Sequence, residues 1–345
     1  MKRYHFPYGI IQRLAMCWRA VALVFPALLL GAANPCSATS LFVSGGTNNM
    51  LYRYDVEPTG TPTLSTSIAT SNPAGIVFGP TGELFVANFS TSTVSRFLDP
   101  LGTLVPNGVL AGLYGPEYLL FRQNELFVVN QFGGNIVRFA FDTAQNASPN
   151  GVITGLGTNE RGIAWNSVTD ELFVTLCCGS NRIKRFIFDA SGHASPNGTI
   201  TGGGLSNPHV MAFSPWGELF VANSFGDNIL RFSFDTLGDA LLSGTITGNG
   251  LEVPVALSFS PWGELFVGNQ TSLGLSPGTV SRWTFDAAHE AIPNGSFTTP
   301  AIHLNGVEFA PSAAIPEPSS LALVVIGTVA LTSVFAKRRR PFRGG

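Results

Sequence analysis

Charged residues and cysteines are both scarce in this chain of 345 residues. Asp, Glu, Lys and Arg make up 12% of it, and the net charge is −2. Between its two ends the sequence lacks the clustered basic surface that nucleic-acid binding needs, so no nucleic-acid partner is expected. Of the four cysteines, only Cys177 and Cys178 fall clearly within the folded part, which excludes a disulfide framework.

Long helices are not expected in the central part of the chain either. The 39 Gly and 23 Pro residues interrupt helices and form turns. The segments between these turns are rich in Val, Ile, Phe and Thr, which favour strands. No phosphate-binding loop is found, so nucleotide chemistry is disfavoured. The sequence therefore predicts an all-β domain over residues 39–314.

The N-terminus has the pattern of a secretory signal peptide. Basic residues, including Lys2 and Arg3, precede an apolar stretch at 20–33. Small residues follow, and Ala33 or Ala38 could each precede a cleavage point. We assign residues 1–38 to a signal peptide, with a longer-lived anchor as the alternative.

The C-terminus carries a second targeting pattern. Pro316, Glu317 and Pro318 precede an uncharged apolar run at 319–336, which would be roughly 27 Å long as a helix and could cross a membrane. A basic cluster follows and should stay on the cytoplasmic side of the membrane. That cluster consists of Lys337, Arg338, Arg339 and Arg340.

These three parts together resemble the PEP-CTERM sorting tail of Gram-negative bacteria. The resemblance implies recognition by an exosortase, cleavage near the Pro-Glu-Pro box, and delivery to the cell surface or extracellular matrix. We assign residues 315–345 to this tail, with 319–336 as its membrane helix. The alternative is an ordinary single-helix anchor.

A repeat fills the middle of the chain. Its signature is Glu-Leu-Phe-Val, which begins at Glu83, Glu125, Glu171, Glu218 and Glu264, with a variant copy at Ser40. Successive copies are 42 to 47 residues apart, the period of four-stranded propeller blades. Each of the five Glu-Leu-Phe-Val copies is preceded by a short apolar strand, and all six copies are followed by a strand ending in Arg plus an aromatic residue. A further short strand completes the unit.

The repeat predicts a closed ring. The first unit has no apolar strand before it, and residues 306–311 match that missing strand. Both ends of the repeat region can therefore complete one blade, which leaves no open edge. We predict a six-bladed β-propeller of four-stranded blades, flanked by the signal peptide and the membrane helix.

Residues 72–88 and 94–97 resemble a repeat of NHL-type six-bladed propellers. The similarity recurs in every unit from about 40 to 311, and it implies the propeller fold. It does not imply a function, because propellers serve binding, scaffolding and several chemistries. Many such repeats end the second strand in Asp, whereas this chain has Asn at four of these positions, including Asn223.

Polar residues are predicted to converge on one mouth of the central channel. The position four residues before each innermost-strand aromatic is occupied by Ala74, Glu117, Arg161, His209, Val255 and Asn305. Glu117, Arg161, His209 and Asn305 could hold a small ligand. The alternative is that the mouth of any propeller channel is polar.

A metal is considered at the same mouth. Glu117, His209 and Asn223 could contribute to an oxygen-rich site similar to the calcium site of gluconolactonase-type propellers. No cofactor is fixed by the sequence, and calcium is the one it could hold. A zinc site is disfavoured because no short His spacing supports it.

Two adjacent cysteines break the repeat. Cys177 and Cys178 replace the usual Ala-Asn at one strand end and could form a vicinal disulfide in an oxidising compartment, or remain free thiols.

The repeated Glu and Arg residues are interpreted as paired groups that pack the blades. A catalytic role would need one odd copy rather than six alike.

The sequence favours an exported, non-enzymatic propeller that acts as a binding or scaffold module at the cell surface. A polysaccharide of an extracellular matrix or another surface protein would be its partner. The alternative is a calcium-dependent hydrolase, similar to lactonases, with Glu117 and His209 as first candidates. Before processing, the C-terminal helix would anchor the chain in the inner membrane.

Overall fold

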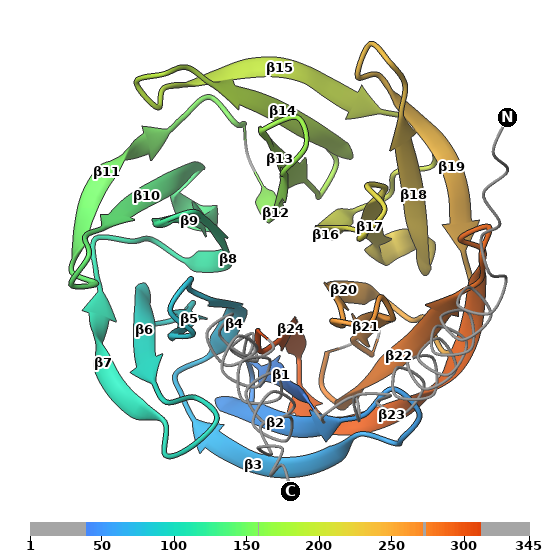
Figure 1. Cartoon of the computed structure of the whole chain (residues 1–345), viewed down its shortest axis with the longest axis horizontal. Coiled ribbons are helices and arrows are strands. Elements are labelled where there is room, and N and C mark those ends of the chain that lie inside the picture. Colours follow the sequence, from blue (N-terminus) through green and yellow to red (C-terminus); the bar gives the residue numbers. More distant parts are fainter. Residues whose placement is uncertain (1–38, 158, 272–273, 312–345) are drawn as a thin grey trace, which may run out of the picture. The chain divides into compact units, whose positions relative to one another are not determined.

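In the described part of the chain, twenty-four antiparallel β-strands form six four-stranded sheets around a central axis (Figure 1). The computed structural model describes residues 39–311, except 158 and 272–273. The all-β six-bladed propeller of four-stranded blades is confirmed. The predicted signal peptide, sorting box and membrane helix lie outside the described residues. Among the residues described, no helix is long and apolar enough to span a membrane.

Five blades are continuous in sequence, and each runs from the axis to the rim. The first is β4 (Pro73–Phe78), β5 (Leu84–Asn88), β6 (Thr93–Leu98) and β7 (Val105–Leu110). The second is β8 (Pro116–Arg122), β9 (Glu125–Asn130), β10 (Asn135–Phe141) and β11 (Ala147–Ile153). The third is β12 (Glu160–Asn166), β13 (Glu171–Leu176), β14 (Arg182–Phe188) and β15 (Ala194–Thr201).

The fourth blade is β16 (Pro208–Phe213), β17 (Leu219–Asn223), β18 (Asn228–Phe234) and β19 (Ala240–Ile246). The fifth is β20 (Pro254–Phe259), β21 (Leu265–Asn269), β22 (Pro277–Phe285) and β23 (Ala291–Ile302). Two single-turn 3₁₀ helices, η1 (Gln131–Gly133) and η2 (Ser224–Gly226), follow the second strands of the second and fourth blades.

The sixth blade closes the ring from both ends of the repeat region. Its strand order is β24 (Leu304–Phe309), β1 (Thr39–Gly45), β2 (Met50–Val56) and β3 (Thr63–Ala69). In the β1–β24 pairing, Leu41 lies opposite Phe309 and Val43 opposite Val307. The predicted seam is therefore confirmed: β24 covers the inner side of β1, so this blade has four strands like the other five.

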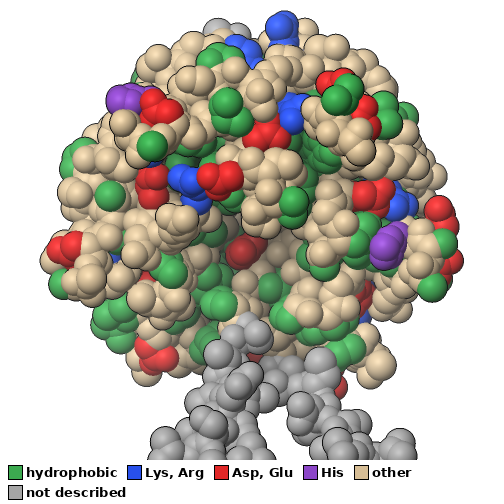
Figure 2. All heavy atoms as spheres, turned by 45° about the horizontal axis from the view of Figure 1, so that its top comes forward, with side chains coloured by type: hydrophobic (Ala, Val, Ile, Leu, Met, Phe, Trp, Pro, Cys, Tyr) green, Lys and Arg blue, Asp and Glu red, His purple; other side chains and the backbone are tan. Residues whose placement is uncertain are grey.

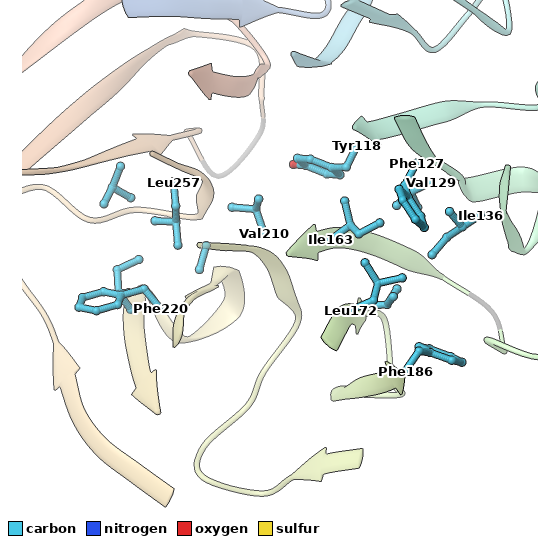
Figure 3. Close-up of a cluster of buried hydrophobic side chains, with 14 of the residues drawn as sticks. Tyr118, Phe127, Val129, Ile136, Ile163, Leu172, Phe186, Val210, Phe220 and Leu257 are labelled. Carbon is cyan, nitrogen blue, oxygen red and sulfur yellow. The ribbon is translucent and has the colours of Figure 1, made fainter. Parts of the chain in front are cut away.

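Large apolar side chains between neighbouring sheets hold the blades together. The Phe of each Glu-Leu-Phe-Val copy is almost completely buried, and Phe85, for example, packs edge-on against Phe121 with ring centroids 4.8 Å apart. Burial of one such side chain contributes about 1.5–3 kcal/mol. Figure 3 shows one of these clusters, with Phe127 and Ile136 on one blade and Leu172 on the next.

The repeated Glu and Arg side chains form buried clusters near the rim. In the first blade Arg96 donates to both carboxylate oxygens of Glu83 at 3.0 and 2.9 Å, and Asn107 of the outermost strand β7 donates to the same carboxylate. Arg96 also donates to the Gln145 carbonyl in the next blade, at 2.8 Å. The same Glu–Arg pair recurs in four further blades. The interpretation of these residues as blade-packing groups is confirmed.

Candidate functional site

The innermost strands bring the predicted mouth residues together. Strands β4, β8, β12, β16 and β20 each contain a register shift close to their first residue, and this bulge lies next to the mouth position. A cavity of about 340 Å³ lies at the mouth. It is lined by Thr47, Asn72, Ala74, Phe89, Glu117, Gln131, Arg161, His303 and Asn305. This size is at the lower end of the range for small-molecule pockets, about 300–1,000 Å³.

Glu117 and Arg161 form the only ion pair found in this lining. Arg161 donates through Nη1 to Oε1 of Glu117, and its Nε lies 3.4 Å from Sγ of Cys177. The second oxygen of Glu117, Oε2, is buried without a hydrogen-bond partner among the described residues. Burial raises the pKa of the Glu117 carboxyl, and the nearby Arg161 charge opposes that rise. The pair thus offers a partly desolvated carboxylate beside a guanidinium.

Amide and hydroxyl groups complete the lining of the mouth. Asn305 donates through Nδ2 to the Pro73 carbonyl at 3.3 Å, and its Oδ1 accepts from Gln270 at 3.3 Å. Asn72 donates to Ser90 Oγ at 2.7 Å. Such groups both donate and accept hydrogen bonds, as a hydroxyl-rich ligand requires.

Tyr118 separates the mouth from the rest of the channel. Its side chain extends from β8 towards Ile163, Val210 and Leu257 of other blades (Figure 3). The hydroxyl lies 2.8 Å from Nδ1 of His209 and donates to the Val255 carbonyl at 2.9 Å. The mouth cavity and the cavity beyond Tyr118 share no lining residue. The phenol therefore acts as a partition across the channel.

The two histidines near the mouth are held neutral. Burial, the Arg161 charge and the neighbouring His303 lower the pKa of His209 to about 3, against a smaller opposing effect of the Val255 carbonyl. Burial and Arg161 also lower the pKa of His303. His209 contacts the Tyr118 hydroxyl, whereas His303 lines the cavity. His303 is thus the histidine placed to meet a ligand.

Three of the four predicted ligand residues, Glu117, Arg161 and Asn305, line the mouth cavity. His209 lies beneath them, on the partition. Asn223 does not join them. Its Oδ1 accepts from the Ser206 backbone N–H at 2.6 Å, and its Nδ2 donates to the Gly204 carbonyl and to Asn228. The side chain is committed to its own blade's turn.

The residues at the mouth do not fit calcium. Calcium takes about six to eight oxygen ligands. Within residues 39–311, as far as they are described, no three His, Cys, Asp or Glu side chains are grouped to hold a metal. The one acidic residue of the cavity, Glu117, is already paired with Arg161, whose positive charge would repel a cation. No step is therefore derived through a metal.

Cys177 and Cys178 form a disulfide beside Arg161. Cys177 is fully buried, Cys178 is exposed, and Cys178 has a positive φ of 56°. Its backbone N–H donates to Asn207 Oδ1 at 3.1 Å. The bridge closes the turn after β13 and supplies an apolar sulfur surface next to the guanidinium.

Sequence reasoning missed Tyr118, Gln131 and the depth to which His209 is buried. Tyr118 stands where three other blades have Gly75, Gly162 and Gly306, a contrast that was available in the sequence. A further string, Gly274-Leu275-Ser276-Pro277-Gly278, matches the spacing of a nucleophile elbow, which joins a strand to a helix. In this protein the string leads into strand β22 rather than into a helix, so it is not a nucleophile elbow.

Comparisons with known proteins support the fold. No protein-family model matches this sequence, and no curated protein sequence does. A proposed 6-phosphogluconolactonase from Bacteroides uniformis shares 19% identity over 76% of this chain and 83% of its own, with a TM-score of 0.59. The periplasmic gluconolactonase PpgL of Pseudomonas aeruginosa shares 17% identity over 81% and 89%, with a TM-score of 0.58.

A third similar structure comes from a nidogen/laminin complex, at 15% identity over 79% of this chain and 99% of the other, with a TM-score of 0.59. At these identities the likeness defines the class of protein by its fold, a β-propeller. The NHL assignment itself stays a prediction from the sequence.

Proposed function

We propose that this propeller is a lactone hydrolase that opens cyclic esters of hydroxyl-rich acids at the mouth formed by Glu117, Arg161 and Asn305. The observation that carries the proposal is the pairing of a desolvated carboxylate with a guanidinium inside a cavity lined by amides and a hydroxyl. Two of the similar structures carry lactonase names, in agreement with this chemistry. Calcium, which the sequence suggested only within the alternative interpretation, is not part of the proposal.

The reaction needs only these residues and water. The Glu117 carboxylate accepts a proton from a water molecule as the water oxygen adds to the lactone carbonyl carbon. The negative charge that develops on the carbonyl oxygen faces the Arg161 guanidinium. The ring C–O bond then breaks, and the ring oxygen takes the proton from Glu117. The product is an open-chain hydroxy acid, and Glu117 returns to its starting state.

The proposal is tested with D-glucono-1,5-lactone, following acid release in a pH-stat above the uncatalysed rate. Glu117→Gln keeps the shape of the side chain but removes the base, so kcat should fall about 100-fold or more. Glu290→Gln, which changes an exposed acid, should leave kcat unchanged. Absence of turnover by the unaltered protein, or full activity of Glu117→Gln, would contradict the proposal.

A non-catalytic binding module is the second candidate, and a cluster of aromatic side chains favours it. Phe132 is 58% exposed and Tyr114 61% exposed, and their rings lie 5.5 Å apart. Phe89, which lines the mouth cavity, lies 5.0 Å from Phe132. Exposed aromatic rings beside a polar cavity suit the apolar faces of sugars. A polysaccharide would be the partner, and Phe132→Ala should weaken its binding about 10-fold without any turnover.

We further propose that the protein is exported and reaches the cell surface through the tail at 315–345. The support is the order of its three sequence features: Pro316-Glu317-Pro318, the apolar run at 319–336, and Arg338-Arg339-Arg340. An exosortase would be the processing partner. Mass spectrometry of the protein from the cell surface should find a C-terminus near the box. An intact tail on the surface protein would contradict processing.

A further inference from the structure

The channel beyond Tyr118 holds a second cavity, which the proposed reaction does not use. Its volume is about 350 Å³, and residues from all six innermost strands line it. Most of these side chains are apolar, as at Ile163, Leu120 and Leu257. Figure 2 shows one face of the propeller hollowed at its centre. Glu308 is the only acidic residue in the cavity lining.

Glu308 is the one acidic residue among the six equivalent positions of the innermost strands. The equivalent position, one residue before the innermost-strand aromatic, is filled in the other blades by Val77, Leu120, Ala164, Ala212 and Ser258. Five blades therefore show that the propeller needs no charge at this position. A carboxyl found in one blade out of six is not explained by the fold.

No opposite charge compensates Glu308. The strands packed against β24 are β1, β4, β20 and β21, and none of them carries a titratable side chain. Within the described part of the chain, the carboxyl has no lysine, arginine or histidine beside it, and its one hydrogen-bond partner is the Ser258 hydroxyl, at 3.4 Å. Burial in these surroundings raises the pKa of Glu308 to about 8, although Ser258 opposes the rise.

Aromatic side chains line the same cavity. Trp165, Phe213 and Phe259 come from three consecutive blades, β12, β16 and β20. Aromatic rings attract organic cations through their negative faces, and the attraction is greatest where water is excluded. A single carboxyl together with such walls favours an ammonium group carried on an apolar body over a hydrated metal ion, which would need more oxygen ligands.

We propose that the channel beyond Tyr118 is a binding site for organic ammonium ions, with Glu308 as the counter-charge and the aromatic side chains as the wall. This site lies in a cavity of its own and is independent of the reaction at the mouth.

The test uses the full chain and benzyltrimethylammonium, whose positive charge does not change with pH. Isothermal titration calorimetry should show one saturable site. The cation binds best when Glu308 is ionised, and a carboxyl with a pKa of about 8 goes from about 1% ionised at pH 6 to about 90% at pH 9, so affinity should rise at least about 10-fold over this range. Glu308→Gln has the same shape without the charge, and it should weaken binding at pH 9 at least 10-fold and abolish the pH dependence.

Glu290→Gln removes one negative charge from the surface and is the matched control, which should bind as the unaltered protein does. Benzyl alcohol tests whether the charge of the ligand matters, and it should bind at least 10-fold more weakly. Equal binding by Glu308→Gln, equal binding of benzyl alcohol, or no saturable binding at pH 9 would each overturn the proposal. Thermal melting establishes that both variants are folded.

Discussion

The rim and the axis of this propeller differ in how strictly they repeat. Near the rim, five blades carry the same buried Glu–Arg pair. At the axis, the mouth position changes from blade to blade, and Glu117, Arg161 and Asn305 each occur once. A group that five blades share serves the packing of blades, whereas a group that a single blade has can serve a ligand. The internal repeat thus provides its own comparison of structure with function.

The largest effect should come from breaking a rim cluster. Arg96→Ala leaves the Glu83 carboxylate buried without its partner, which should lower the free energy of unfolding by about 3–5 kcal/mol. Arg53→Ala is the natural control, because its blade has Ser40 in place of Glu and no buried carboxylate loses its partner. Arg53 bonds to the exposed Ser65 and to the Pro100 and Leu101 carbonyls of the next blade instead. Its loss should cost less, about 1–2 kcal/mol. Urea unfolding measures the free energy of unfolding of both variants, and equal losses would contradict a special role for the Glu–Arg pair.

A smaller loss should come from filling the close contact between two innermost strands. A Cβ at Gly75 would lie 2.5 Å from the Glu117 carbonyl oxygen and 2.9 Å from Tyr118 Cα, both backbone atoms. Gly75→Ala should therefore cost about 1–3 kcal/mol. At Gly244 a Cβ would be 3.5 Å from the nearest atom, on the Arg231 side chain. Gly244→Ala should be neutral or slightly stabilising, and urea unfolding compares the two variants.

Glu308 should make the free energy of unfolding depend on pH. Its pKa is raised to about 8 in the folded protein, so above the unfolded pKa of 4.5 the unfolded chain loses its proton first. Stability is thus lost as pH rises from about 4.5 to 8. Glu308→Gln removes this loss and should raise the free energy of unfolding at pH 9 by roughly 1–3 kcal/mol, but not at pH 4. The same gain at both pH values would contradict the assignment.

His209 produces the opposite trend at low pH. Its pKa of about 3 lies below the unfolded value of 6.5, so the unfolded chain binds a proton first as pH falls. Stability from the neutral imidazole is present above about pH 6.5 and is lost between 6.5 and 3. Acid unfolding of His209→Gln should begin at a lower pH than that of the unaltered protein. An unchanged acid transition would show that His209 is not the group responsible.

The smallest effect on stability should come from removing the Tyr118 hydroxyl. Tyr118→Phe removes the hydroxyl that contacts His209 and the Val255 carbonyl, and should cost about 1 kcal/mol. Tyr114→Phe, at an exposed ring, should cost nothing measurable. Thermal melting separates the two, and an equal response would indicate that the Tyr118 hydroxyl bonds are not formed.

Much of the fold and part of the site follow from the sequence. The Glu-Leu-Phe-Val period located every blade, and the match between residues 306–311 and the missing first strand gave the seam. The same period placed Glu117, Arg161 and Asn305 on one ring, because equivalent positions of a closed repeat lie at equal depth along the axis.

The remaining features of the site depend on the directions of side chains, which the spacing of the sequence repeat does not define. Asn223 was expected near the mouth, but its amide bonds within its own turn. Tyr118 reaches across the channel because its long side chain meets carbonyls of other blades. The sequence shows Glu308 as the one acidic residue at its repeat position, but only the folded structure shows that no charged side chain of the described residues lies beside it.

Substitution of two glutamates tests most directly whether repeated residues serve the fold and unique residues serve the function. Glu83 belongs to the repeated rim and Glu117 to the variable mouth, and each is changed to Gln while lactone turnover per folded molecule and the free energy of unfolding are measured together. We predict that Glu83→Gln lowers stability by several kcal/mol, about 3–5, and keeps turnover. Glu117→Gln should keep stability within about 1 kcal/mol and lose turnover at least about 100-fold. Loss of turnover in both variants, or in neither, would contradict the separation of fold from function.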